Sequence, residues 1–169
     1  VFFEQPTFPK TKLERKCLVN NLIAFANKNP EDNIIIKPRF GVMVGHAHTP
    51  KYLLQDILLR IKNKPENIFI SNEPIYELFK KCKLAITISS TAGIESLLVN
   101  IPTLFITDFC NNINKYGSED FKKFNATISF DELLKGRLPK ITYNDVERTL
   151  RCDGKNTSRL TRELIKITK

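Results

Sequence analysis

Short apolar runs alternate with amphipathic segments along the first two thirds of the chain. Five runs have the length and continuity of strands that are buried on both faces: VFFEQ (1–5), NIIIK (33–37), IFI (68–70), LAITI (84–88) and TLFIT (103–107). The segments between them repeat apolar residues at helical spacing, which predicts helices over about 10–27, 51–62, 74–81 and 91–99. The inward positions expected for the first two helices are Leu13, Cys17, Leu22 and Phe25 or Ala26, and then Leu54, Ile57, Leu58 and Ile61.

Continuous apolar strands that alternate with single helices predict a parallel sheet covered on both faces, with right-handed crossovers. The fold class is therefore α/β, a Rossmann-like doubly wound parallel sheet. After Phe124 the pattern weakens, with a strand expected at 126–128, a short helix at 131–135 and helices near 144–151 and 158–167. We expect one domain over residues 1–169, with 125–169 as a C-terminal helical extension.

The composition limits the partners of this domain. The chain has 169 residues, 41% of them hydrophobic, and a formal net charge of +9, which favours an anionic partner. Its four cysteines are scattered, without metal-ligand spacing, so we expect no metal site and a reducing, cytoplasmic compartment. The stretch 84–106 is the one that most resembles a membrane-spanning segment, but Glu95, Asn100 and Pro102 interrupt its apolar sequence.

Ser89, Ser90 and Thr91 stand where an expected strand ends and a helix begins. Hydroxyls, backbone N–H groups and the positive end of the helix dipole meet at such a point, which makes it a candidate phosphate site. Gly93 would allow a ligand or a strand to approach closely, and Glu95 could accept hydrogen bonds from sugar hydroxyls. The alternative is that Ser90 or Thr91 caps the helix and that Gly93 is a packing contact.

The segment KPRFGVMVGHAHTP (37–50) holds the second group of candidates. Lys37 and Arg39 follow a strand, and both histidines of the chain, His46 and His48, lie in the loop after them. An imidazole there could donate a proton to a departing phosphate, or it could be an ordinary loop residue. Asp108, at the end of the 103–107 strand, would orient a donor molecule or cap the loop that follows.

The order of these motifs resembles the C-terminal, donor-binding half of bacterial GT-B-type glycosyltransferases. It is most similar, over residues 2–125, to a family with the pattern V-K-x-R, a T-H loop, P-Y, VTVSSTAALEAL, a G-x-P turn and L-T-D-F. The chain departs from the pattern at Asn100, where glycine is usual, and at Val42, where an acidic residue is expected. The matching residues are Lys37, Arg39, His46 or His48, Ser89, Ser90, Thr91, Ala92, Glu95, Pro102, Thr107, Asp108 and Phe109.

The resemblance implies transfer of a sugar from a nucleotide-activated donor to a surface glycan, without a metal or another cofactor. HAHTP and ISSTAG are similar to the His-Pro and Ser-Ser/Thr motifs of bacterial sialyltransferase families, in which the first assists the leaving phosphate and the second binds it. The acidic base motif of those families has no match here, so it would belong to a second, N-terminal Rossmann-like domain. The implied acceptor is a glycan, which can be lipid-linked, so that peripheral contact with the inner face of a membrane is expected.

Two other classes of function stay open. A sugar-nucleotide epimerase or hydrolase would have a related fold but would need its own internal acid and base. A non-enzymatic basic domain would bind nucleic acid or acidic lipid. The chain has 4 Tyr and no Trp, and no recognition motif or stacking platform for nucleic acid is visible, so we expect no specific nucleic-acid partner.

Overall fold

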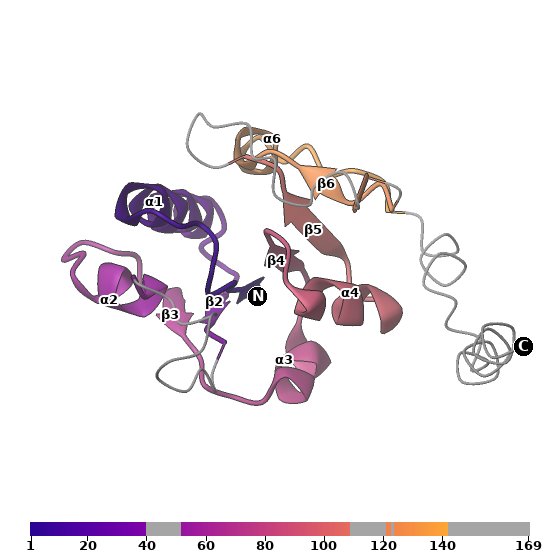
Figure 1. The fold of residues 1–169 in the computed structure, drawn as a ribbon, viewed down its shortest axis with the longest axis horizontal. Helices are drawn as coiled ribbons and strands as arrows, with labels where there is room; N and C mark the ends of the chain where they lie inside the picture. The colour runs from indigo at the N-terminus through magenta and orange to yellow at the C-terminus, as the bar shows by residue number, and fades with distance from the viewer. Residues whose placement is uncertain (40–51, 109–120, 123, 142–169) are drawn as a thin grey trace, which may run out of the picture.

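A computed structural model describes residues 1–39, 52–108, 121–122 and 124–141. They form a six-stranded sheet in the order β3-β2-β1-β4-β5-β6, and every neighbouring pair of strands is parallel (Figure 1). The strands are β1 (Phe2–Phe3), β2 (Ile34–Lys37), β3 (Ile68–Ile70), β4 (Ala85–Thr87), β5 (Thr103–Ile106) and β6 (Thr127–Ile128). The helices are α1 (Lys12–Lys28), α2 (Leu54–Leu59), α3 (Ile75–Lys81), α4 (Thr91–Leu98) and α6 (Phe130–Leu134).

The strand order reverses between β1 and β4. The chain runs outward from β1 to β2 and β3, then returns to β4 on the other side of β1 and continues to β5 and β6. Phe3 is in register with Lys37 on one side and with Thr87 on the other. This is the strand order of a Rossmann-like doubly wound fold, which confirms the predicted fold class. In such sheets ligands bind where the order reverses, beyond the carboxyl ends of the strands.

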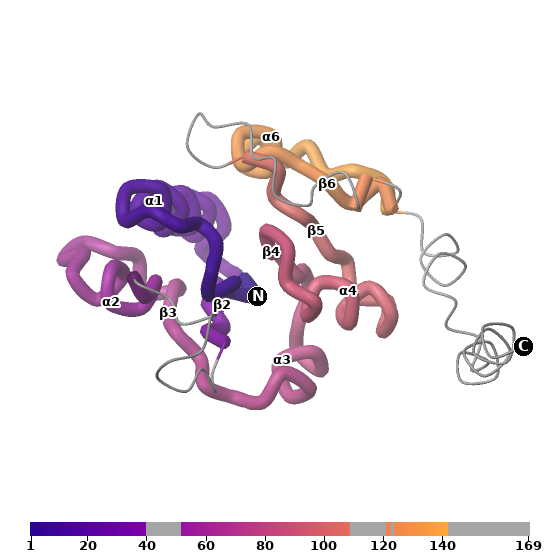
Figure 2. Tube along the Cα trace, viewed as in Figure 1, coloured from indigo at the N-terminus to yellow at the C-terminus, as the bar shows by residue number. Residues whose placement is uncertain are grey.

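Helices cover both faces of the sheet (Figure 1). On one face α1 packs against α2 and α6, and their apolar side chains join Phe2, Ile36 and Ile86 in the largest core cluster. Figure 2 shows α6 returning to the α1 side of the sheet, although most of the chain separates the two helices. On the other face Phe3, Ala85 and Ala92 pack with residues of α3 and its C-terminal end. The helices that connect the parallel strands therefore cover both faces of the sheet, as the alternation of strands and helices in the sequence predicts.

The predicted strands are all confirmed within one or two residues at their ends, including the short one at 126–128, and so is the helix expected at 131–135. α1 begins at a capping box in which Thr11 and Glu14 bond each other's backbone. α2 is shorter than expected, but Leu54 and Leu58 are buried as predicted. The helices expected near 144–151 and 158–167 lie outside the described residues. None of the helices described is long and apolar enough to cross a membrane.

The prediction for the inward face of α1 is wrong at its first turn. Leu13 is 72% exposed, whereas Arg15, a charged residue, is 1% exposed. The buried positions of α1 are Arg15, Leu18, Val19, Leu22 and Ala26, which follow the helical period more closely than the predicted set does. A search for apolar residues alone does not find this buried face of α1, because it assigns the charged residue Arg15 to the solvent-exposed side.

Candidate nucleotide-binding cleft

Residues from three strand ends and from α4 meet in a cleft of about 280 Å³ next to the point where the strand order reverses. β1 contributes Phe3 and Glu4 follows it, the chain after β2 contributes basic residues, and α4 contributes its first turn. The lining residues are Phe3, Glu4, Lys37, Pro38, Arg39, Ile75, Ser90, Thr91, Ala92 and Glu95. Five of the predicted donor-binding residues are therefore brought together: Lys37, Arg39, Ser90, Thr91 and Glu95.

The first turn of α4 forms one wall of the cleft. Ser90 is the N-cap residue, and its Oγ accepts a hydrogen bond from the backbone N–H of Ala92 at 3.3 Å. Its own N–H donates to Thr87 Oγ1 at 3.1 Å, while Thr87 Oγ1 donates to the carbonyl of Phe3 at 2.9 Å. Thr87 thus fixes the helix start to β1 across the point where the strand order reverses. Ser90 is a cap, as the alternative interpretation has it, and it also lines the cleft at the positive end of the helix dipole.

Two cations stand opposite this helix end. Lys37 is the last residue of β2 and is half-buried, and burial lowers the pKa of its ammonium group. Arg39 is exposed and lies two residues further along. A phosphate in the cleft would face both cations and the first turn of α4. Partial burial strengthens such attraction because the effective dielectric constant is lower than in water.

Two of the predicted phosphate-binding or donor-binding residues have other partners and do not line the cleft. The hydroxyl of Ser89 donates to Oε1 of Gln5 at 2.9 Å, so its proton is engaged by the loop after β1. Asp108 Oδ1 accepts a hydrogen bond from the backbone N–H of Phe130 at 3.3 Å, at the first residue of α6. Asp108 therefore binds the N-terminus of α6, and the loop at 109–112 of the alternative interpretation lies outside the described residues.

Gly93 is a packing position against the sheet. A Cβ built on it would lie 2.7 Å from Thr87 Cγ2 and 2.9 Å from the ring of Phe105. Its N–H also donates to the carbonyl of Ser90 at 3.0 Å. The close approach that the sequence predicted for this glycine is therefore made by β4 and β5, and it sets how near α4 lies to the carboxyl edge of the sheet.

We expect Gly93→Ala to lower the free energy of unfolding by about 1–3 kcal/mol, because an added methyl group overpacks this contact. Urea denaturation of the two proteins measures the difference. Ser96→Ala in the same helix is the comparison variant, since it removes the buried hydrogen bonds to Gly93 and Thr103 without adding volume. A Gly93→Ala protein as stable as the wild type would contradict the packing role.

A buried ion pair beneath the cleft was not predicted. Glu4 Oε1 and Arg15 Nη1 are 2.7 Å apart, and both side chains are almost fully buried. Burial raises the pKa of the Glu4 carboxyl, and Arg15 and a hydrogen bond from the backbone of Leu54 partly offset this effect. Arg15 also donates to the carbonyls of Pro9 and Pro6, at 2.7 and 2.5 Å. The pair thus holds the loop after β1, and with it the partner of Ser89, in one conformation.

The predicted catalytic residues His46 and His48 lie outside the described residues. Within the described part of the chain, no group of three or more His, Cys, Asp or Glu side chains is arranged to hold a metal ion. Cys17 and Cys82 are both in the reduced thiol form, outside any disulfide.

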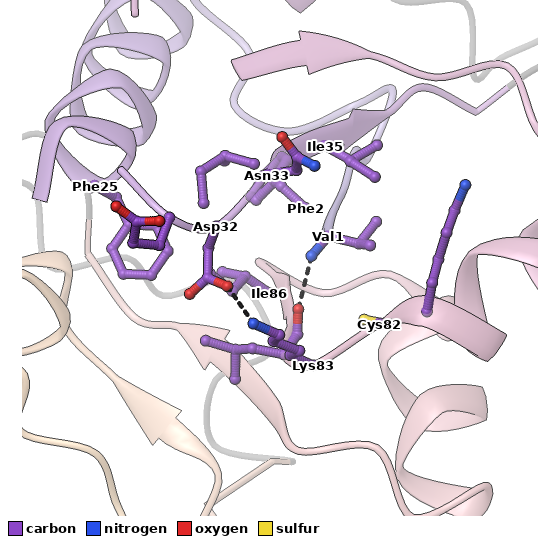
Figure 3. A pocket seen from close by; sticks show the side chains of 13 residues that line it. Val1, Phe2, Phe25, Asp32, Asn33, Ile35, Cys82, Lys83 and Ile86 are labelled. Atoms are coloured by element: carbon purple, nitrogen blue, oxygen red, sulfur yellow. Dashed lines mark hydrogen bonds and ion pairs between the residues drawn. The ribbon is translucent and has the colours of Figure 1, made fainter. Parts of the chain in front are cut away.

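A second cavity, of about 260 Å³, lies at the opposite, amino edge of the sheet (Figure 3). It contains an ion pair between Lys83 and Asp32 at 2.6 Å, and a hydrogen bond from the amino group of Val1 to the carbonyl of Leu84 at 2.7 Å. Its Lys83 and Asp32 are paired with each other, and doubly wound sheets bind ligands at the other edge. The cleft at the carboxyl edge is therefore the stronger candidate.

The topology and the cleft define an α/β domain of the Rossmann-like class, with a cleft lined by Lys37, Arg39 and the first turn of α4 where nucleotides bind in such folds. Residues 1–145 match the family whose description reads "Putative glycosyltransferase (DUF6716)", and the chain belongs to this family. It is also similar to Protein FixF of Sinorhizobium fredii (strain NBRC 101917 / NGR234), with 30% identity over 118 residues. That match covers 68% of this chain and 25% of FixF, so the chain corresponds to about a quarter of that relative.

Proposed function

We propose that this chain is the donor-binding domain of a GT-B-type glycosyltransferase that takes its sugar from a nucleotide-activated donor. The observation that carries the proposal is the cleft beside the reversal of strand order, where Lys37, Arg39 and the first turn of α4 converge. The family supports glycosyl transfer, and the cleft supports an anionic ligand. A nucleotide-activated sugar donor fits both the family and the cations of the cleft.

The proposed mechanism follows from where charge develops. In an inverting transfer an acceptor hydroxyl attacks the anomeric carbon as the nucleotide phosphate departs, and negative charge grows on that phosphate. Lys37, Arg39 and the N–H groups at the start of α4 would stabilise it, because they line the cleft in which that charge would develop. His46 or His48 would supply a proton to the leaving group. This scheme needs no metal.

The remaining parts of the proposal concern partners. A second, N-terminal Rossmann-like domain would supply the catalytic base and complete the active site. The acceptor would be a surface glycan such as a capsule or lipooligosaccharide, and CMP-sialic acid is one donor that fits the resemblance to sialyltransferases. A cytoplasmic enzyme in peripheral contact with the inner face of the membrane would reach lipid-linked acceptors.

A thermal-shift panel of CMP, UDP, GDP and ADP tests the proposal. We expect CMP or UDP to stabilise the folded chain by about 2.7 kcal/mol at a concentration of 100 times its Kd. Free ribose at the same concentration is the control, since it lacks the phosphate. No response to any nucleotide from a folded protein would refute the donor site.

A further inference from the structure

A third cavity, of about 500 Å³, runs between α1 and α2 and is distinct from the cleft. The two helices pack side by side on the face of the sheet away from α3 and α4 (Figure 1). Its lining combines three kinds of side chain: basic, hydrogen-bonding, and apolar or aromatic. The lining residues are Lys12, Lys16, Asn20, Tyr52, Leu53, Asp56, Ile57, Arg60 and Ile61.

The basic side chains of this groove are not neutralised by ion pairs. Within the described ranges, no salt bridge is formed by Lys12, Lys16 or Arg60, whereas Lys80, Lys81, Lys83 and Lys135 are each paired with a carboxylate. Asp56 is the one acidic residue among the lining residues, against three cations. The groove therefore has a net positive charge, and concave surfaces concentrate such a field.

The cations and the hydrogen-bonding side chains lie in a row. Lys12, Lys16 and Asn20 are four residues apart on α1, so they share one face of the helix and span about 12 Å along its axis. Asp56 on α2 and Arg60, the C-cap residue of that helix, are also four residues apart. Two such rows facing an apolar floor fit an elongated ligand that carries repeated polar groups, rather than a single small ion.

We propose that this groove binds an anionic oligosaccharide, the negatively charged glycan on which the enzyme acts. The cations fit its carboxylates or phosphates, Asn20 can donate or accept hydrogen bonds with hydroxyls, and the carboxylate of Asp56 can accept them. The ring of Tyr52, with Ile57 and Ile61, offers an apolar surface for the C–H faces of sugar rings. The inference rests on the proposed function, since it assigns the acceptor of that reaction.

The test is calorimetric titration of the full chain with trigalacturonate, which carries carboxylates, and with maltotriose, which is neutral. We expect trigalacturonate to bind and maltotriose to bind at least about tenfold more weakly. The double variant Lys12→Gln, Lys16→Gln should weaken trigalacturonate binding by about tenfold or more. The matched control is Lys80→Gln, Lys81→Gln on α3, which changes the net charge equally on the opposite face and should have little effect.

Four results would overturn the inference: no trigalacturonate binding, equal loss in both double variants, inorganic phosphate binding as tightly as the trisaccharide, or binding to phosphatidylglycerol vesicles in place of it. A nucleotide titration of the same proteins separates this inference from the proposed function. If a nucleotide binds and trigalacturonate does not, the groove assignment alone fails. If trigalacturonate binds and no nucleotide does, the donor site fails and the groove remains a glycan site.

Discussion

Arg15→Ala should lower the free energy of unfolding by about 3–5 kcal/mol, because it leaves the buried carboxylate of Glu4 without its cation. Arg15 also binds three backbone carbonyls of the loop after β1, and these acceptors would lose their donor. Urea denaturation at neutral pH measures the change. The neighbouring Lys16→Ala is the control, since this exposed residue of the same helix should alter stability by less than about 0.5 kcal/mol.

The pH dependence of this loss distinguishes charge from packing. Burial already raises the pKa of Glu4, and removing Arg15 should raise it further because Arg15 lowers it. A carboxyl with a raised pKa in the folded state favours folding when protonated, and this advantage is lost as the pH rises from the unfolded pKa through the folded one. The stability gap between wild type and Arg15→Ala should therefore narrow on acidification. A gap that is small at neutral pH, or that does not change with pH, would contradict the ion-pair account.

Arg39→Ala in the full-length enzyme should reduce kcat by about 10²–10³-fold, the usual cost of removing one preorganised group that faces a developing oxyanion. Arg39 is exposed and lines the cleft, so its loss should leave the stability of the fold nearly unchanged. Steady-state kinetics with the nucleotide-sugar donor measures the effect. Arg137→Ala is the matched control, because Arg137 is an exposed arginine outside the cleft. Unchanged turnover in Arg39→Ala would remove this cation from the mechanism.

The sequence predicts the strands and the candidate residues at their ends because continuous apolar runs, here NIIIK and LAITI, mark buried parallel strands. It predicts Lys37 and Ser90 for the cleft because Lys37 ends the first of these runs and Ser90 stands two residues after the second. It does not predict the strand order, which decides that β1 lies between β2 and β4. For that reason the contribution of Glu4 to the cleft was missed.

Some contacts of the candidate residues could not be predicted from the sequence, and the physical cause is the same for each. Ser89 and Asp108 are bound by Gln5 and Phe130, partners that are 84 and 22 positions away in the chain. Such contacts depend on tertiary structure and leave no trace in local spacing. The close packing of Gly93 against Phe105, on the next strand, is also a tertiary contact that local spacing does not reveal. Arg15 could have been found, because it is in helical phase with Leu18 and Leu22.

The central claim is that a nucleotide binds where the strand order reverses, and a crystal structure with bound CMP or UDP tests it most directly. The account predicts that the phosphate lies between the first turn of α4 and the side chains of Lys37 and Arg39. A nucleotide bound instead in the cavity of Lys83 and Asp32 at the amino edge, or in the groove between α1 and α2, would contradict it.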